Sequence, residues 1–316
     1  MPAPAPMAKI GILSIGDMGM GIAKLLLANG FAVATNCKGR SQETIDRCQA
    51  ANVEVLKSDV ELTDACSVIL SVVPPRDALA TATRVVESLV GVSQRAAGPL
   101  YFVAGAHPVR GRMHLGWPPS LKKKPDEGPS SADADTDKDK DISKSWSRPG
   151  IPTSGPHKLS DIPVYGEALA TTLHTRHISP EIGAASGLKM CFASTTKGFT
   201  ALAIQSFTTA QKLGVLDELK QELSDRGAWD RAAGSVTAMA PKAYRWVREM
   251  EEIALTFEED GGFAPDSFQG AAKVFQAVAD SELGNEKIGK RKRGTTVEDV
   301  AEALSEGMDK RKKKTV

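Results

Sequence analysis

The stretch Ala8-Lys-Ile-Gly-Ile-Leu-Ser-Ile-Gly-Asp-Met-Gly-Met-Gly21 opens with a short apolar run and ends in closely spaced glycines. Ile22–Asn29 follows as a good helix former closed by Gly30, and Phe31–Thr35 is a second apolar run. Strand, glycine turn, helix and strand together predict a βαβ unit. Glycines let a ligand approach the backbone closely, and the free N–H groups at a helix start favour a diphosphate. The stretch therefore predicts a dinucleotide-binding domain.

The glycine pattern departs from the usual GxGxxG fingerprint at its first position. Ser14 stands where the first glycine is expected, and Gly16 and Gly19 follow at the remaining spacing. Glycine turns between strands and helices are also common for steric reasons alone, so a purely structural turn is the alternative. The surrounding βαβ pattern favours nucleotide binding over that alternative.

The residues after the second strand indicate which dinucleotide is favoured. An NAD site usually carries a carboxylate about twenty residues beyond the glycines, where it binds the ribose 2′-hydroxyl. Thr35-Asn-Cys-Lys-Gly-Arg-Ser41 contains no carboxylate. Lys38, Arg40 and Ser41 suit a 2′-phosphate instead, so NADP is favoured over NAD, with a solvated basic turn as the alternative.

Short strands and helices continue to alternate further along the chain. Ser67–Val73 is nearly continuously apolar, which is typical of a buried parallel strand. Pro74-Pro75 ends it at the edge where parallel sheets bind their ligands. Asp77–Val90 predicts an amphipathic helix and Pro99–Val103 a further strand. This alternation predicts an α/β fold with a Rossmann-like, doubly wound sheet.

The regular pattern stops after that sheet. Residues 121–148 are highly charged and almost free of apolar side chains, so a disordered insert is predicted there. Its acidic run lacks the glycine and terminal glutamate of a calcium loop, and no metal site is expected. After the insert the chain predicts a helix over Ile162–Leu173 and a short segment Thr175–Ile178, and from residue 183 only helices until it turns polar and basic at Glu286. The expected parts are a Rossmann-like domain over 1–182, an all-α domain over 183–285 and a solvated tail over 286–316.

A proline-free run from Glu181 to Gly214 predicts a helix of roughly eight turns. One semi-polar face of this helix carries Lys189, Ala193, Thr196, Lys197 and Thr200. A semi-polar stripe on such an apolar helix predicts a polar partner. We expect the helix to join two domains and to offer Lys189 to a substrate between them. The alternative is a lysine that snorkels from an ordinary core helix.

Composition excludes several classes of protein. The 316 residues are enough for two domains, and 40 basic against 39 acidic residues leave a net charge of +1. The net charge therefore gives no electrostatic indication of binding to nucleic acid or to an anionic membrane. Four dispersed cysteines, no signal peptide and no membrane-length apolar run favour a soluble cytoplasmic protein with reduced thiols. The basic clusters after Glu286 leave nuclear import open as an alternative.

Three segments, Ile10–Ala23, Ser71–Pro75 and Ile182–Met190, resemble the β-hydroxyacid dehydrogenase superfamily. Lys189–Leu202 and Trp246–Ala254 resemble the branch with a 6-phosphogluconate-dehydrogenase-like C-terminal domain. The resemblance implies an NAD(P)-dependent dehydrogenase or reductase that acts on a CH–OH group. Its expected substrate is a small carboxylic acid of the 3-hydroxyacid type, and the expected assembly is a homodimer formed through the helical domain.

The resemblance and the residue patterns together assign roles to individual residues. The expected cofactor-binding residues are Ser14, Gly16, Asp17, Met18, Gly19, Asn36, Lys38, Arg40, Ser41, Val73, Pro74 and Pro75. The expected substrate-binding residues are Gly116, Pro118, Pro119 and Thr196. Lys189 is expected to pass a proton to or from the substrate oxygen as hydride moves, which is general acid–base catalysis. Lys197 is a secondary catalytic candidate, with positioning as its more plausible role.

Two departures from the superfamily pattern bear on activity. Ala193 stands where an asparagine usually follows the lysine, so Ser194, Thr196 or Lys197 would have to supply the polar contact. In the substrate segment 106–119 a tryptophan replaces a glycine, and the helix and loop expected before it are missing. A gene-model error would produce this pattern, and so would a degenerate, inactive family member.

Two alternatives to an active dehydrogenase therefore remain. The first is a catalytically impaired NADP-binding regulatory protein, which the altered substrate segment and Ala193 support. The second is an enzyme similar to imine reductases, which share this architecture. Lys189 argues against that second alternative, because imine reductases usually replace the lysine.

Overall fold

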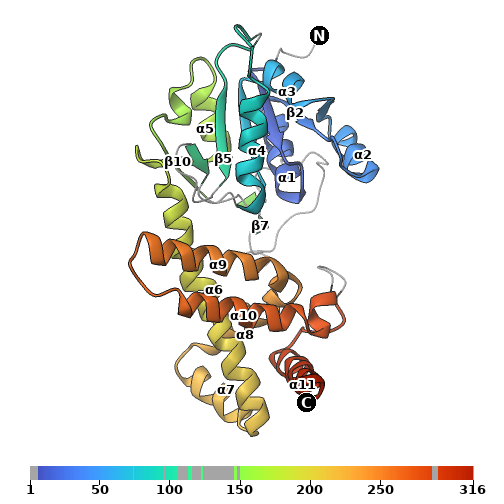
Figure 1. The fold of residues 1–316 in the computed structure, drawn as a ribbon, viewed down its shortest axis with the longest axis vertical. Helices are drawn as coiled ribbons and strands as arrows, with labels where there is room; N and C mark the ends of the chain where they lie inside the picture. The colour runs from blue at the N-terminus through green and yellow to red at the C-terminus, as the bar shows by residue number, and fades with distance from the viewer. Residues whose placement is uncertain are drawn as a thin grey trace, which may run out of the picture. The chain divides into compact units, whose positions relative to one another are not determined.

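The computed structural model describes residues 6–73, 75–95, 97–105, 113–115, 122–123, 146–147, 150–286 and 291–315. The chain forms two compact units, Met1–Lys189 and Met190–Val316 (Figure 1). Unit 1 holds a sheet with its helices, and unit 2 is helical. The division falls after Lys189, inside the long helix, rather than after residue 182.

Unit 1 is built on an eight-stranded sheet of order β10-β9-β6-β5-β4-β1-β2-β3. Its strands are β1 (Lys9–Leu13), β2 (Ala32–Asn36), β3 (Glu54–Leu56), β4 (Val68–Ser71), β5 (Tyr101–Gly105), β6 (Met113–Leu115), β9 (Ile151–Ser154) and β10 (Thr175–Ser179). Strands β1 to β6 are parallel, whereas β9 is antiparallel to β6 and parallel to β10. The succession β3-β2-β1-β4-β5-β6 is the strand order of dinucleotide-binding folds, which confirms the predicted Rossmann-like sheet.

Helices cover both faces of this sheet. They are α1 (Asp17–Ala28), α2 (Gln42–Ala50), α3 (Asp59–Ala65), α4 (Pro75–Glu87) and α5 (Gly166–Leu173). Ile10 and Ile12 of β1 lie in one core with residues of α1 and α5. Leu13 of the same strand lies in a second core with Leu62 of α3 and Val85 of α4. Because successive side chains of a strand point to opposite faces, β1 contributes to both cores and the sheet is doubly wound.

Two elements of unit 1 differ from the sequence-based expectation. Helix α1 begins at Asp17, directly after Gly16, so Gly19 and Gly21, which were expected in the glycine turn, are helical. Helix α3 was not predicted, although Ser58 and Glu61 have the spacing of a capping box. Glu61 N donates to Ser58 Oγ at 3.1 Å, and Lys57 N donates to Glu61 Oε2 at 2.9 Å. Both differences arise because glycines and a seven-residue length give weak helix signals.

Only part of the expected insert over 121–148 is described. Within it β7 (Lys122–Lys123) and β8 (Trp146–Ser147) form a short antiparallel ladder. The remainder lies outside the described residues, so disorder there stays a prediction. None of the helices in the described part of the chain has the length and apolar character needed to cross a membrane.

Unit 2 confirms the predicted all-α domain. Its helices are α6 (Ala184–Leu213), which begins in unit 1, α7 (Leu216–Asp225), α8 (Trp229–Met239), α9 (Ala243–Glu259), α10 (Asp266–Ala279) and α11 (Val297–Thr315). Helix α6 has 30 residues, as the proline-free run predicted. Helices α9 and α10 lie side by side (Figure 1), and Trp246 meets Phe275 edge-on with ring centroids 5.2 Å apart.

The expectation of a solvated tail after Glu286 is corrected by α11. Val297, Val300 and Leu304 are at most 3% exposed and belong to the core of unit 2. They recur at i, i+3 and i+7, the spacing of one helix face, but the surrounding charges hide this pattern in the sequence. The basic cluster at 287–290 lies outside the described residues.

We expect Leu304→Ala to lower the free energy of unfolding by about 2–4 kcal/mol, because it removes buried methyl groups and leaves a cavity. Glu302→Ala, on the exposed face of the same helix, is the matched control and should change stability by less than about 0.5 kcal/mol. Urea unfolding followed by the fluorescence of Trp229 and Trp246, both in unit 2, measures the difference. Equal stability of the two variants would contradict a structural role for α11.

Candidate functional site

The turn between β1 and α1 has the geometry of a phosphate-binding site. Gly16 precedes α1 with extended backbone, and no side chain caps the helix. A Cβ on Gly16 would meet no atom within 4 Å, so this position faces open space. A Cβ on Gly19 would lie 2.3 Å from Ser14 O. Gly19 therefore lets the helix pack against the turn, while Gly16 leaves the N–H groups of the helix start accessible to an anion.

The loop after β2 presents two basic side chains. Arg40 N donates to Cys37 O at 2.9 Å, and Gly39 between them has φ +75°, as a tight turn of this kind requires. Lys38 and Arg40 are both exposed. The loop passes directly into α2, which Ser41 caps by accepting from Thr44 N at 3.4 Å. The loop thus combines exposed cations with the N-terminus of a helix.

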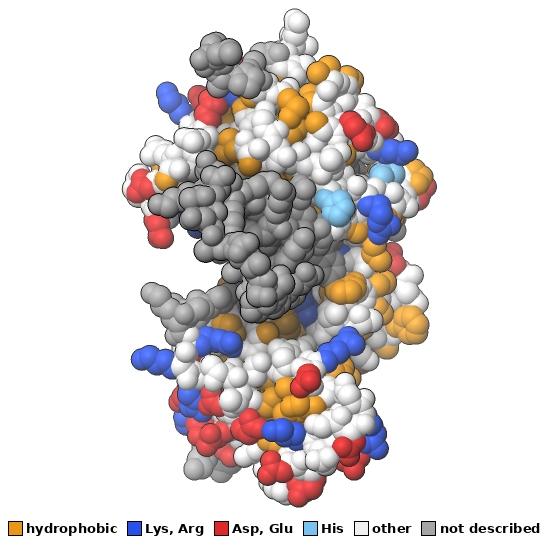
Figure 2. All heavy atoms as spheres, turned by 180° about the vertical axis from the view of Figure 1, so that it is seen from behind, with side chains coloured by type: hydrophobic (Ala, Val, Ile, Leu, Met, Phe, Trp, Pro, Cys, Tyr) orange, Lys and Arg blue, Asp and Glu red, His pale blue; other side chains and the backbone are white. Residues whose placement is uncertain are grey.

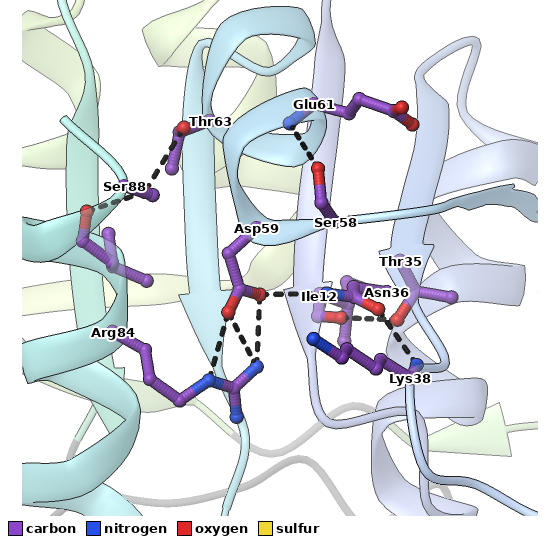
Figure 3. A network of polar contacts seen from close by, with 11 residues as sticks. Ile12, Thr35, Asn36, Lys38, Ser58, Asp59, Glu61, Thr63, Arg84 and Ser88 are labelled. Carbon is purple, nitrogen blue, oxygen red and sulfur yellow. Dashed lines mark hydrogen bonds and ion pairs between the residues drawn. The ribbon is translucent and has the colours of Figure 1, made fainter.

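Asn36, the last residue of β2, holds this loop. Its Oδ1 accepts from Lys38 N at 2.8 Å, and its Nδ2 donates to Asp59 Oδ1 at 2.9 Å. Asp59 is in turn paired with Arg84 of α4 (Figure 3). Asn36 was expected to bind cofactor, and in the structure both polar atoms of its amide also make contacts within the protein.

Arg47 of α2 was not predicted as a site residue. Its Nη2 donates to Ile15 O at 3.3 Å, so α2 is tied to the glycine turn. The guanidinium lies in this way beside the predicted diphosphate position. A single arginine on an exposed helix gives no recognisable signal in the sequence, because such residues usually belong to a solvated face.

The structure describes only some of the residues that were predicted to lie beside the nicotinamide and the substrate. Val72 and Val73, which follow β4, are half-buried, and Pro75 opens α4. Pro74, Gly116, Pro118 and Pro119 lie outside the described residues, and so does the side chain of Asp17. The described strand β6 ends at Leu115, directly before the predicted substrate segment.

Lys189 lies in the first turns of α6, within unit 1. The start of this helix is tied to the sheet, because Ala185 N donates to the buried Ser154 Oγ at the end of β9 at 3.0 Å. The side chain of Lys189 is partly buried. The structure therefore places the expected acid–base residue in the same unit as the predicted cofactor site.

Lys197 lies in unit 2 and has a different environment. Its Nζ forms an ion pair with Glu249 of α9 and lies 5.1 Å from the centre of the Trp246 ring. Its side chain is 18% exposed and that of Glu249 is 29% exposed. These contacts join α6 to α9.

Thr196 and Thr200 on the semi-polar face of α6, and Ser194 near it, donate to carbonyls of their own helix. Thr196 Oγ1 donates to Phe192 O at 3.2 Å, and Thr200 Oγ1 donates to Thr196 O at 3.0 Å. Ser194 Oγ donates to Cys191 O at 2.7 Å. Serine and threonine in helices satisfy themselves in this way. On this face, the hydroxyls are thus satisfied within the helix, whereas Lys197 has its polar partner, Glu249, on α9.

The cysteines are free thiols, and three of them are buried. Burial raises the pKa of Cys66 to about 12. Burial, and then the neighbouring Cys37, raise the pKa of Cys48 to about 11. These thiols stay protonated near neutral pH and are not nucleophiles. This confirms that they fill the core, whereas Cys191 is exposed.

Two family models match parts of the chain. One, described as "NADP oxidoreductase coenzyme F420-dependent", matches residues 9–93. The other, a domain of unknown function (DUF1932), matches residues 210–278 in unit 2. No curated protein matches the chain.

Solved structures with the same fold cover almost the whole chain. The 3-hydroxyisobutyrate dehydrogenase of Mycobacterium tuberculosis, solved with L-serine, is 14% identical over 94% of this chain and 99% of that one, with a TM-score of 0.58. A conserved hypothetical protein from Sinorhizobium meliloti 1021 is 16% identical over 95% and 97%, also with a TM-score of 0.58. A conserved protein described as similar to 3-hydroxyacid dehydrogenases is 19% identical over 86% and 97%, with a TM-score of 0.54. The resemblance to hydroxyacid dehydrogenases is thus confirmed for the fold.

We expect Gly16, Gly19 and Gly21, at and after the start of α1, to respond differently to alanine. Gly16→Ala should change stability by less than about 0.5 kcal/mol, because its Cβ meets nothing, yet weaken NADPH binding about tenfold or more by occupying the diphosphate position. Gly19→Ala should destabilise the fold by about 1–3 kcal/mol through the clash with Ser14 O.

Gly21→Ala is the matched control. Its Cβ also meets nothing within 4 Å, and alanine in this helix should stabilise by about 0.5–1 kcal/mol with unchanged binding. Thermal unfolding and titration by NADPH fluorescence measure both effects. Wild-type NADPH affinity in Gly16→Ala would exclude the turn as the diphosphate site.

Proposed function

We propose that this chain is an NADP-dependent oxidoreductase that transfers a hydride between the nicotinamide and a small hydroxyacid of the 3-hydroxyacid type. The observation that carries the proposal is the uncapped helix start at Gly16 next to the basic loop after β2. The first site suits a diphosphate and the second a 2′-phosphate. The family model that matches residues 9–93, described as a coenzyme F420-dependent NADP oxidoreductase, supports the same cofactor.

The residues of this chain would divide the work between binding and proton transfer. The diphosphate is held by the turn and helix start, Ser14, Gly16, Asp17, Met18 and Gly19. The 2′-phosphate is held by Lys38, Arg40 and Ser41. The nicotinamide, beside Val73, Pro74 and Pro75, supplies the hydride chemistry. Lys189 takes the hydroxyl proton when the carbon gives up its hydride, and returns it in the reverse direction.

The structure supports a positioning role for Lys197 rather than a catalytic one. Its ammonium is engaged by Glu249 and by the face of Trp246. We propose that this cluster holds α6 against α9 and so keeps the helix that carries Lys189 straight. Thr196 stays a proposed substrate contact, through the lone pairs that its bond to Phe192 O leaves free.

A second candidate function is an NADP-binding regulatory protein without turnover. The back-bonded hydroxyls of Ser194 and Thr196 favour it, because they already donate to helix carbonyls and Ala193 cannot replace the asparagine usual at that position. Both candidates bind NADP, so only turnover distinguishes them. An imine-reductase-like activity is a third candidate, against which Lys189 argues.

Homodimer formation through the helical unit also stays a proposal. Figure 2 shows hydrophobic side chains on the surface of unit 2. The large exposed ones of this unit include Leu202, Leu213, Tyr244 and Phe263, each at least 64% exposed. A contiguous patch of such side chains is what an interface between two copies would require.

We expect NADPH to raise the thermal midpoint of the chain and a panel of 3-oxoacids to be reduced with loss of absorbance at 340 nm. Lys189→Ala should lower kcat/KM by about 10²–10⁴, because the proton donor is lost, while NADPH affinity is retained. Lys212→Ala is the control: Lys212 lies on the same helix as Lys189 but forms a surface ion pair with Asp309 of α11, so this variant should keep full turnover. Undiminished turnover in Lys189→Ala would remove it as the acid–base residue.

Lys197→Met should lower stability and keep turnover, whereas Lys189→Ala should lower turnover. We expect it to lower the free energy of unfolding by about 1–3 kcal/mol, because the carboxylate of Glu249 loses its cation. Turnover per folded molecule should persist, and the double variant Lys197→Met/Glu249→Gln should recover most of the stability. A stable variant without turnover would instead make Lys197 catalytic.

A further inference from the structure

We propose that Arg84 is a specificity-determining residue, which keeps the ribose end of the cofactor site selective for a 2′-phosphate by neutralising Asp59. The inference rests on the proposed NADP-binding function and deepens it. Neither residue belongs to the glycine turn or to the basic loop. Their effect would be transmitted to the cofactor through Asn36.

Arg84 and Asp59 form a two-pronged ion pair. Arg84 Nε donates to Asp59 Oδ2 at 2.9 Å and Arg84 Nη2 donates to Asp59 Oδ1 at 2.9 Å (Figure 3). This fork geometry matches the two carboxylate oxygens and fixes the orientation of both groups. The Asp59 side chain is only 19% exposed, whereas that of Arg84 is 50% exposed. The carboxylate is thus the better shielded partner, and its charge is offset mainly at this contact.

The same carboxylate reaches the end of β2. Asn36 Nδ2 donates to Asp59 Oδ1 at 2.9 Å, and Asn36 Oδ1 accepts from Lys38 N at 2.8 Å (Figure 3). Asn36 is 9% exposed, so this amide is nearly enclosed. A continuous chain of hydrogen bonds therefore runs from α4 through Asp59 and Asn36 to the loop that carries the exposed Lys38 and Arg40.

The position of Asp59 connects the ion pair to the choice between NAD and NADP. In sites selective for NAD a carboxylate at the end of the second strand accepts from the ribose 2′-hydroxyl. Here the sequence offers none between Thr35 and Ser41, but the fold brings Asp59 one hydrogen bond away from Asn36. A free carboxylate there would repel a 2′-phosphate, which carries about 1.5 to 2 negative charges near neutral pH. Arg84 cancels that charge and leaves Lys38 and Arg40 to attract the phosphate.

A purely structural role for the pair predicts a different outcome. Arg84 and Asp59 also join α4 to α3, and loss of that contact alone would weaken NADPH and NADH alike. Loss of charge compensation would weaken NADPH selectively. The ratio of the two dissociation constants therefore separates the two roles, and it needs no turnover.

The experiment measures the binding of NADPH and NADH to the full chain by cofactor fluorescence at low ionic strength. The wild type is expected to prefer NADPH. Arg84→Met should reduce that preference about five- to tenfold, through weaker NADPH binding, and added salt should diminish the shift. Arg84→Met/Asp59→Asn, in which the carboxylate is also removed, should restore the preference. Arg84→Lys should keep most of it, because the charge is retained.

Arg226→Met is the matched control. It removes one positive charge and a surface ion pair with Glu222 in unit 2, with both side chains about two-thirds exposed, and should leave the preference unchanged. If Arg84→Met weakens both cofactors equally, or if removing the carboxylate does not restore the preference, the inference is overturned and the pair is structural. If the wild type binds neither cofactor, the proposed function itself fails.

Discussion

The backbone at Gly19 can approach the carbonyl oxygen of Ser14 because Gly19 has no side chain. A Cβ there would lie 2.3 Å from that oxygen, which is closer than real Cβ contacts. This approach sets the first turn of α1 directly on the end of β1, so its free N–H groups open at the edge where the parallel strands end. The basic loop and the half-buried residues Val72 and Val73 follow β2 and β4, the strands on either side of β1. The candidate cofactor site therefore depends on this one close approach.

The candidate cofactor site combines backbone groups held in fixed positions with exposed side chains that can move. Gly16 and Gly19 belong to backbone that the sheet and α1 hold in place, whereas Lys38 and Arg40 are exposed side chains. The hydrogen bonds of Asn36 and the turn at Gly39 limit how far the second group can move. Arg47 of α2, the helix that follows the basic loop, connects this loop's helix to the glycine turn by donating to Ile15 O. Affinity for the diphosphate would thus come mainly from preorganised backbone, and discrimination between dinucleotides from charge.

The sequence predicted what depends on local pattern. The βαβ unit, the parallel sheet, the all-α unit and the long helix follow from periodicity, glycines and the absence of proline, and all are confirmed. The start of α1 and the whole of α3 were not predicted, because glycines and short length weaken a helix signal. Helix α11 was mistaken for a tail because charges surround its apolar face. Contacts such as Arg84 with Asp59, 25 residues apart, and Arg47 with Ile15, 32 apart, leave no local pattern at all.

Hydrogen–deuterium exchange of the full chain with and without NADPH tests the central claim most directly. A dinucleotide on the turn after β1 and the loop after β2 should slow exchange at the amides of residues 14–20 and 36–41, because both would be covered. NADH should slow exchange at residues 14–20 but protect 36–41 less. Unchanged exchange in both segments, or protection confined to unit 2, would contradict a dinucleotide site at this edge of the sheet.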